Sequence, residues 1–260
     1  MIILKLKMRN INLLNTKVSF ENRKFETEIK ISTMNVIEVK DLKKIYDNSE
    51  VIVNALNGID LIVEQGEFTA IVGPSGSGKT TFLNMLGGLD SPTEGEITIG
   101  GIQIQQLSST QLIDFRLRNI GFVFQAYNLI PVLTAIENVE FIMQMQGVSK
   151  PERMQRAREL LIQVGLGERI NSRPSKLSGG QQQRVAVARA LASKPKFVLA
   201  DEPTANLDRK STENLLEIME ELNQKENITF IFSTHDQRVV NKARRVITLE
   251  DGKIISDERT

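Results

Sequence analysis

The sequence predicts an α/β fold in which helices pack against a mainly parallel sheet. Short apolar runs, typical of strands buried on both faces, alternate along the chain with longer stretches of helical character. One such run leads directly into a glycine-rich loop, and a helix-compatible stretch follows the loop. The chain has 260 residues, 40% of them apolar, which is enough for one compact domain with a sizeable core.

Strands are expected, in chain order, at residues 36–39, 59–63, 68–72, 120–124, 197–200 and 228–232. Because Asn57-Gly58 is a turn dipeptide, a turn is expected ahead of the second strand. Residues 246–249 and 253–255 flank Asp251-Gly252 and predict a terminal hairpin. Helices are expected at residues 81–86, 150–164, 181–192 and 209–225. Since helices separate the later strands, the order favours parallel pairing.

Composition excludes several kinds of site. The chain has no cysteine, and its single histidine is His235. These counts exclude a disulfide scaffold, thiolate catalysis, Cys-ligated zinc and any site that needs two imidazoles. The net charge of +1 supplies no basic field of the kind that coats nucleic acid, so no nucleic-acid partner is expected.

The sequence also bears on the location of the protein. No run approaches the ~18–20 consecutive apolar residues that span a bilayer. The first ten residues lack the basic, apolar and small-residue regions of a secretory signal. We therefore expect a soluble chain that stays in the cytoplasm.

The charge divides the chain into two unlike parts. Residues 1–33 have a net charge of +4, whereas residues 34–260 have a net charge of −3. Two interpretations of the basic segment stay open: an appended arm, or residues upstream of a biological start at Met34. The folded domain is expected at residues 34–260.

The strongest motif is a phosphate-binding loop that fits G-x-x-x-x-G-K-[ST] between a strand and a helix. It reads Gly73-Pro74-Ser75-Gly76-Ser77-Gly78-Lys79-Thr80. Its glycines let the backbone turn so tightly that successive N–H groups point at one anion, and the next helix adds its positive N-terminal end. Lys79 can reach the terminal phosphates of a nucleotide, and the Thr80 hydroxyl can ligate Mg²⁺.

Two consecutive acids, Asp201 and Glu202, end the apolar run 197–200. Ligands bind at the carboxyl ends of strands in such sheets. Because side chains alternate along a strand, the two carboxylates need not share a role. Asp201 can hold Mg²⁺ through water, while Glu202 is directed at an attacking water.

A second candidate anion site reads Leu177-Ser178-Gly179-Gly180-Gln181 and opens a helix. The Ser178 hydroxyl, the free amides and the helix dipole converge on one point. The alternative is a plain N-cap, which explains Ser178 but not the glycine pair.

Taken together in this order, the motifs resemble the nucleotide-binding subunit of ABC transporters, whose signature is LSGGQ, over about residues 36–255. The resemblance implies a P-loop NTPase (RecA-like) core with an antiparallel β subdomain and an α-helical subdomain at about residues 126–175. It also implies Mg²⁺-dependent ATP hydrolysis by two copies paired head to tail. Residues 178–181 of one copy would then face the phosphate-binding loop of the other. A C₂ dimer joins two anion sites that a single copy leaves apart.

The resemblance assigns further roles. Tyr46 stacks on the adenine, and Thr81 adds a nucleotide contact. Gln125 reaches Mg²⁺ and the attacking water, and Asp208 lies in a loop that crosses the dimer interface. In that loop, Ala205 and Asn206 replace the more widespread serine and alanine. Glu202 is the general base and His235 the switch histidine that contacts the γ-phosphate.

Residues 126–147 are rich in apolar side chains, and in the family this part accepts an element of a membrane permease on a separate chain. The alternative is that these residues only build the core of the helical subdomain.

Residues 88–95, 120–125 and 128–131 look most like the macrolide-exporter and lipoprotein-release group. The implied function is an ATP-hydrolysing subunit, on the inner face of the cell membrane, that powers export or extraction of an amphiphile.

One alternative is a force-transmitting ATPase of the cell-division type. Another is a soluble ABC ATPase acting on DNA or ribosomes. The second is disfavoured because neither a coiled-coil insertion nor a second cassette appears in the sequence.

Overall fold

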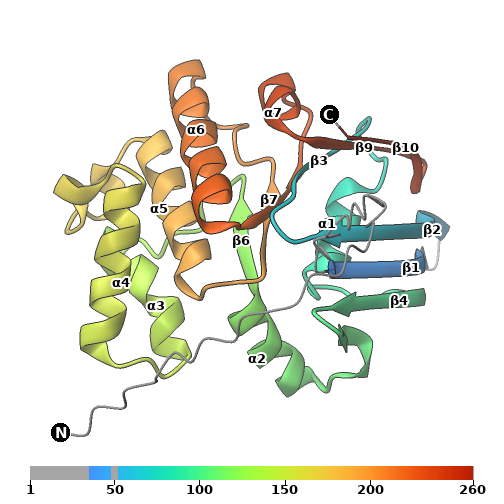
Figure 1. The fold of residues 1–260 in the computed structure, drawn as a ribbon, viewed down its shortest axis with the longest axis horizontal. Coiled ribbons are helices and arrows are strands. Elements are labelled where there is room, and N and C mark those ends of the chain that lie inside the picture. The colour runs from blue at the N-terminus through green and yellow to red at the C-terminus, as the bar shows by residue number, and fades with distance from the viewer. Residues whose placement is uncertain (1–34, 48–51, 260) are drawn as a thin grey trace, which may run out of the picture. The chain divides into compact units, whose positions relative to one another are not determined.

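The computed structural model describes residues 35–47 and 52–259, so the basic segment 1–33 lies outside the described residues. The described residues form two sheets, one with strand order β10-β9-β3-β8-β7-β6 and one with order β2-β1-β4-β5. Figure 1 shows β1, β2 and β4 on one side of this domain and α3, α4 and α5 on the other.

The six-stranded sheet confirms the predicted α/β class. Its strands are β3 (Phe68–Val72), β6 (Ile120–Phe124), β7 (Phe197–Asp201), β8 (Thr229–Ser233), β9 (Arg245–Glu250) and β10 (Lys253–Arg259). Strands β6, β7, β8, β3 and β9 pair in parallel, and β10 pairs antiparallel with β9 across the predicted hairpin turn.

The four-stranded sheet is antiparallel and corrects one expectation. Its strands are β1 (Asn35–Asp47), β2 (Ile52–Glu64), β4 (Glu94–Ile99) and β5 (Ile102–Gln103). Asn57 and Gly58 lie inside β2 and do not form a turn before it. The register shifts between the pairs Leu42–Ile59 and Lys43–Asn57, and Gly58 has a φ of 82°. The dipeptide therefore makes a β-bulge, which uses the same left-handed backbone as a turn.

The described helices include three that the apolar periodicity did not indicate. The helices are α1 (Lys79–Leu86), α2 (Ser109–Asn119), α3 (Ala135–Met145), α4 (Lys150–Gln163), α5 (Gly179–Ala192), α6 (Arg209–Glu226) and α7 (Gln237–Lys242). Of these, α2 and α7 were not expected, and α3 lies within the helical subdomain that the family resemblance implied without being located itself. Both α2 and α3 begin with a capping box, formed by Ser108 with Gln111 and by Thr134 with Glu137. This local signal would have located both helix starts.

The central strands separate two apolar cores. On β8, Phe230 and Phe232 face the core shared with α3–α6, whereas Ile231 faces the core shared with α1 and the four-stranded sheet. Such alternation follows from the period of two along a strand, and both faces are apolar because both are covered. The carboxyl ends of β3, β7 and β8 are thereby held rigidly at one edge of the sheet.

Candidate functional site

Many of the predicted site residues meet in a cleft of about 650 Å³ at the carboxyl ends of β3, β7 and β8. Those that line it are Tyr46, Gly73, Ser75, Gly76, Gly78, Lys79, Thr80, Thr81, Glu202 and His235. The N-terminus of α1 and residues 53–55 of β2 complete the wall. Ligands of parallel α/β sheets bind at this edge because the loops between strands and helices gather there.

The phosphate-binding loop requires glycine at its first and sixth positions. A Cβ at Gly73 would collide with the carbonyl oxygen of Leu249. At Gly78 the φ is 100°, and a Cβ would lie 2.5 Å from the carbonyl oxygen of Ala55. Because Gly78 precedes α1 without a side-chain cap, the first amides of that helix have no side-chain acceptor. The loop and helix therefore present backbone donors suited to an anion.

Two polar side chains of the loop are held inside it. Lys79 Nζ donates to the carbonyl oxygens of Gly73 at 2.8 Å and Pro74 at 2.9 Å. The Ser77 hydroxyl is buried and has no hydrogen-bond partner among the described residues. A positive charge and an unpaired buried hydroxyl beside free amides fit a polyphosphate.

Asp201 ends β7 and fits the predicted cation site. Its Oδ1 is buried, with no hydrogen-bond partner among residues 35–47 and 52–259. Burial raises the pKa of the Asp201 carboxyl above its ordinary value, although the nearby Ser233 hydroxyl opposes this rise. An unpaired carboxylate oxygen close to the Thr80 hydroxyl is a donor set that Mg²⁺ accepts. The residues present therefore fit a magnesium ion held by Thr80 and Asp201.

Glu202 and His235 form a pair at the mouth of the cleft. Nδ1 of His235 lies 2.7 Å from Oε1 of Glu202, and the Thr234 hydroxyl donates to Oε2 at 3.4 Å. The Glu202 side chain is mostly buried, whereas the imidazole is exposed. The backbone amide of Glu202 donates to the Ser233 carbonyl at 2.9 Å, which brings the ends of β7 and β8 together.

Gln125 directly follows β6, and it does not line the cleft. Since Phe124 is in register with Asp201, Gln125 stands beside the end of β7. Its carbonyl oxygen accepts a hydrogen bond from Asn206 Nδ2 at 3.1 Å. The metal and water contacts of the Gln125 side chain stay predictions.

The signature segment lies outside the described cleft lining, and two of its residues cap a helix. The Ser178 hydroxyl accepts from the Gln181 amide, and Gln181 Oε1 accepts from the Ser178 amide at 2.9 Å, as in a capping box. The glycine pair has a local reason as well. A Cβ on Gly179 would lie 2.7 Å from the Tyr127 hydroxyl, and one on Gly180 would lie 2.8 Å from Ser211 Cβ.

Asp208 is likewise a helix cap. Its carboxylate accepts from the Ser211 amide at 2.9 Å and from the Ser211 hydroxyl at 2.6 Å, which lowers the pKa of Asp208. The side chain is exposed at the start of α6. Its contact with a second copy stays a prediction.

Sequence reasoning missed Asp236, which ties the histidine loop to the glutamate loop. Its Oδ2 accepts from the buried Thr204 hydroxyl at 2.7 Å, and its carboxylate binds the Arg238 guanidinium. The available signal was the N-cap position of Asp236 before α7, but nothing local points to Thr204.

A second hollow, of about 470 Å³, is mostly apolar and lies between β6, α2 and α3. Its apolar lining includes Ile113, Phe122, Phe124, Ile130, Phe141, Ile142 and Met145. Arg189, which is half-buried and lines the hollow, donates to the carbonyl oxygens of Tyr127 and Asn128. Of the apolar residues expected to dock a partner, Ile136 and Met143 lie in the core, whereas Met145 is exposed.

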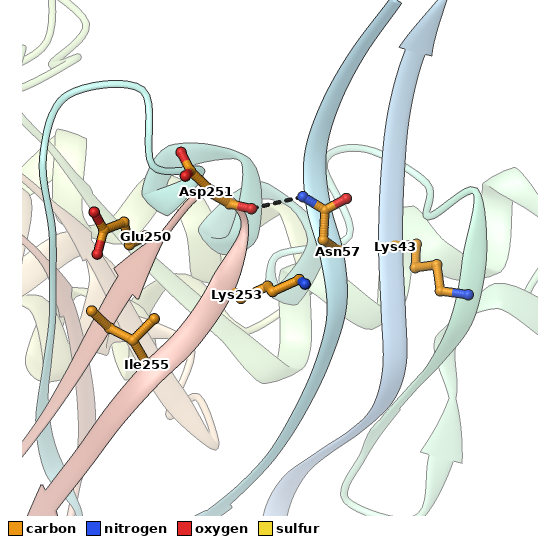
Figure 2. Close-up of a pocket in the computed structure, with 6 residues that line it drawn as sticks. All are labelled: Lys43, Asn57, Glu250, Asp251, Lys253 and Ile255. Carbon is orange, nitrogen blue, oxygen red and sulfur yellow. Dashed lines mark hydrogen bonds between the residues drawn. The ribbon is translucent and has the colours of Figure 1, made fainter.

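A third hollow, of about 630 Å³, is lined by residues that are mostly polar or charged, with charges of both signs (Figure 2). Asn57 Nδ2 donates to the Asp251 carbonyl oxygen at 2.7 Å across it. Figure 2 shows the ammonium group of Lys43 directed away from Asp251. The residues that line this hollow present no convergent set of polar groups.

Comparison with known proteins places the chain in a family. The family profile described as "ABC transporter" matches residues 56–205. An uncharacterized ABC transporter ATP-binding protein of Thermotoga maritima is 50% identical over 224 residues, covering 86% of this chain and 95% of the relative. The macrolide export ATP-binding/permease protein MacB of Hyphomonas neptunium is 49% identical over 222 residues. That match covers 85% of this chain but 34% of the relative.

Among solved structures, the ATP-binding cassette MJ0796 of Methanocaldococcus jannaschii matches with a TM-score of 0.79 at 44% identity. The match covers 86% of this chain and 98% of that chain, in a dimeric post-hydrolysis state bound to ADP and Pi. In the part of the chain that the structure describes, no helix has both the length and the apolar character needed to cross a membrane.

These matches in sequence and in fold agree with the site, where the phosphate-binding loop, the paired acids and the histidine lie at one edge of the sheet. The chain belongs to the ABC transporter ATP-binding family and has its P-loop NTPase fold.

Proposed function

We propose that this chain is the Mg²⁺-dependent ATP-hydrolysing subunit of a transporter that exports or extracts an amphiphile through a membrane permease on a separate chain. The observation that carries the hydrolytic part is the meeting of Lys79, Glu202 and His235 in one cleft beside Asp201. A cation, a carboxylate base and an imidazole around free backbone amides suit phosphoryl transfer to water.

In the proposed mechanism, the loop amides and Lys79 hold the β- and γ-phosphates and neutralise the charge that develops on them. Thr80 and Asp201 hold Mg²⁺, which when bound supplies further neutralisation of phosphate oxygens. Glu202 accepts a proton from water as the new O–P bond forms and the bond to the ADP oxygen breaks. His235 holds the Glu202 carboxylate in place through the 2.7 Å contact and is exposed enough to reach the γ-phosphate.

The proposal includes a head-to-tail dimer. Its support is that the signature segment lies away from the cleft of its own chain, so that each copy carries two separate anion-binding elements. A dimer that places α5 of one copy against the cleft of the other would complete both sites. The similar cassette MJ0796 is dimeric, which supports the pairing of two copies.

The membrane partner is supported by the apolar hollow between β6, α2 and α3, whose lining includes Phe124, the residue before Gln125. An exposed aromatic and aliphatic surface suits an apolar helix of a partner protein. The export role is supported by similarity to macrolide export ATP-binding/permease proteins MacB, and with it we propose that the chain acts at the inner face of the membrane.

The test of the hydrolytic proposal is the E202Q variant. Because glutamine cannot accept the proton of the attacking water, ATP hydrolysis should fall by about 100-fold or more. ATP binding should persist, and gel filtration with ATP should show more dimer than the unmodified protein does. An E202Q variant that hydrolyses ATP at the unmodified rate would remove Glu202 from the role of base.

A further inference from the structure

The predicted adenine platform is held by two side chains that no comparison assigns to the nucleotide site. The hydroxyl of Tyr46, near the end of β1, donates to Asp90 Oδ2 at 2.8 Å. Lys44 Nζ in turn donates to Asp90 Oδ1 at 2.8 Å and to the Ser91 carbonyl oxygen at 2.8 Å. The same ammonium lies 4.7 Å from the centroid of the Tyr46 ring.

These contacts restrict the Tyr46 ring in two ways. The bond to Asp90 opposes rotation of the ring about its side-chain bonds. The Lys44 ammonium covers one face of the ring through a cation–π contact, so a base can stack only on the other face. Tyr46 lines the cleft together with Thr81 and Val53, so the free part of the ring belongs to the nucleotide site.

The Lys44–Asp90 pair differs from an ordinary surface ion pair. The neighbouring pair, Lys43 with Glu94, has the same 2.8 Å separation, with side chains 36% and 59% exposed. The Lys44 and Asp90 side chains are only 12% and 33% exposed. The Lys44 ammonium lies over the Tyr46 ring, whereas the Lys43 ammonium is paired with Asp41 and Glu94. Lysine side chains are seldom this buried unless their ammonium group is paired, as that of Lys44 is with Asp90.

Asp90 also connects the platform to the phosphate-binding loop. It lies four residues beyond α1, whose first residue is Lys79. The turn between them is fixed by hydrogen bonds from the Leu89 amide to the Asn84 carbonyl at 2.9 Å and from Arg116 to the Gly88 carbonyl at 2.7 Å. The ring and the loop are therefore attached to opposite ends of one short helix.

We propose that Asp90 and Lys44 are positioning residues that hold the Tyr46 ring at a set place relative to the phosphate-binding loop and so determine affinity for the nucleoside part of ATP. This inference rests on the proposed function. It assigns the two residues to base binding and leaves the chemical step to the residues of the cleft.

The test compares Y46F, D90A and K43A. Y46F keeps the stacking ring and removes only the hydroxyl that bonds Asp90, and D90A removes the acceptor. In both we expect KM for ATP to rise about 3- to 10-fold with kcat changed less than twofold. The inhibition constant of tripolyphosphate, a competitor without a base, should stay unchanged. K43A is the matched control because it removes the lysine of the exposed pair. Its KM for ATP should stay within twofold of that of the unmodified protein.

The double variant Y46F/D90A should be no worse than D90A alone, because both single changes break the same hydrogen bond. Two results would overturn the inference. One is a KM for ATP that is unchanged in both Y46F and D90A. The other is an inhibition constant of tripolyphosphate that rises in these variants to the same extent as the KM for ATP. Y46F decides the matter if D90A does not fold. If the unmodified protein does not hydrolyse ATP, it is the proposed function that fails.

Discussion

Glu202 has a left-handed backbone with a φ of 44°, a conformation that costs a non-glycine residue about 1–2 kcal/mol. The surroundings hold it there, since its amide bonds the Ser233 carbonyl and its carboxylate meets His235 and Thr234. Asp236 supports the same region by holding the buried Thr204 hydroxyl. The carboxylate predicted to act as base is thus aimed by contacts from the next strand.

The contacts of the Asp236 carboxylate can be tested by varying the pH. Burial raises the pKa of Asp236, but the Arg238 guanidinium and the Thr204 hydroxyl outweigh burial and lower the pKa to about 2. A carboxyl with a lowered pKa stabilises the fold above its unfolded pKa, and this contribution is lost as the pH falls through the folded pKa.

We expect D236N to lower the free energy of unfolding by about 2 kcal/mol at pH 7, and this deficit to shrink to about half by pH 3. Urea unfolding of both proteins at pH 7, 5 and 3 measures it. A deficit that stays constant with pH would show that the Asp236 charge is not its cause.

Helix α3 presents two different faces. Val139 and Met143 are buried in the core, whereas Phe141 and Met145 are exposed and line the apolar hollow. The core interpretation of this region describes the first face, and the second face is the one on which we propose that a partner docks. An apolar periodicity alone does not distinguish them, because a helix buried on one side and docked on the other has both faces apolar.

The docking surface is tested by M145E with I162E as the matched control. Both side chains are exposed, at 61% and 58%, and Ile162 lies on α4, away from the lining of the hollow. When the tagged chain is purified from detergent-solubilised membranes with ATP, M145E should lose the membrane subunit that the unmodified chain retains. I162E should keep it, and both should hydrolyse ATP in solution. Equal retention by M145E and I162E would place the partner elsewhere.

Across the whole domain, Arg245 joins the two sheets. This β9 residue donates to both Asp257 oxygens on β10, to Glu67 and to the carbonyl oxygen of Ile62 on β2. Only 7% of its side chain is exposed, and the bonds to Asp257 and Glu67 raise its pKa against the effect of burial. Since β9 pairs with β3, the Arg245 guanidinium also restrains β3, the strand that leads into the phosphate-binding loop.

We expect R245M to lower the free energy of unfolding by about 3 kcal/mol, because it removes the buried guanidinium that pairs with the half-buried Glu67 and with Asp257. K225A breaks an exposed pair with Glu221 and should change it by less than about 0.5 kcal/mol. Urea denaturation measures both without the screening that guanidinium salt adds. A loss below about 1 kcal/mol in R245M would mean that packing, not the ion cluster, joins the sheets.

The local patterns along the chain were sufficient for the α/β class, the parallel strands and the family. A strand, a glycine-rich loop and a helix are each specified by neighbouring residues, so their order can be read directly. The bulge at Gly58 was predicted as a turn because both need the same left-handed backbone, and only the partner strand distinguishes them. The short helix α7 buries a single residue, Val239, so it has no apolar periodicity to detect.

Contacts between distant residues were decided by the tertiary structure alone. Thr204 and Asp236 are 32 positions apart, and Lys44 and Asp90 are 46 apart. The close approach of Ser211 to Gly180 likewise depends on how α6 packs against α5. Such pairs carry no periodic signal, because their meeting depends on the packing of whole elements. The motifs thus name the groups that would act on ATP, and the packing around them sets where each group points.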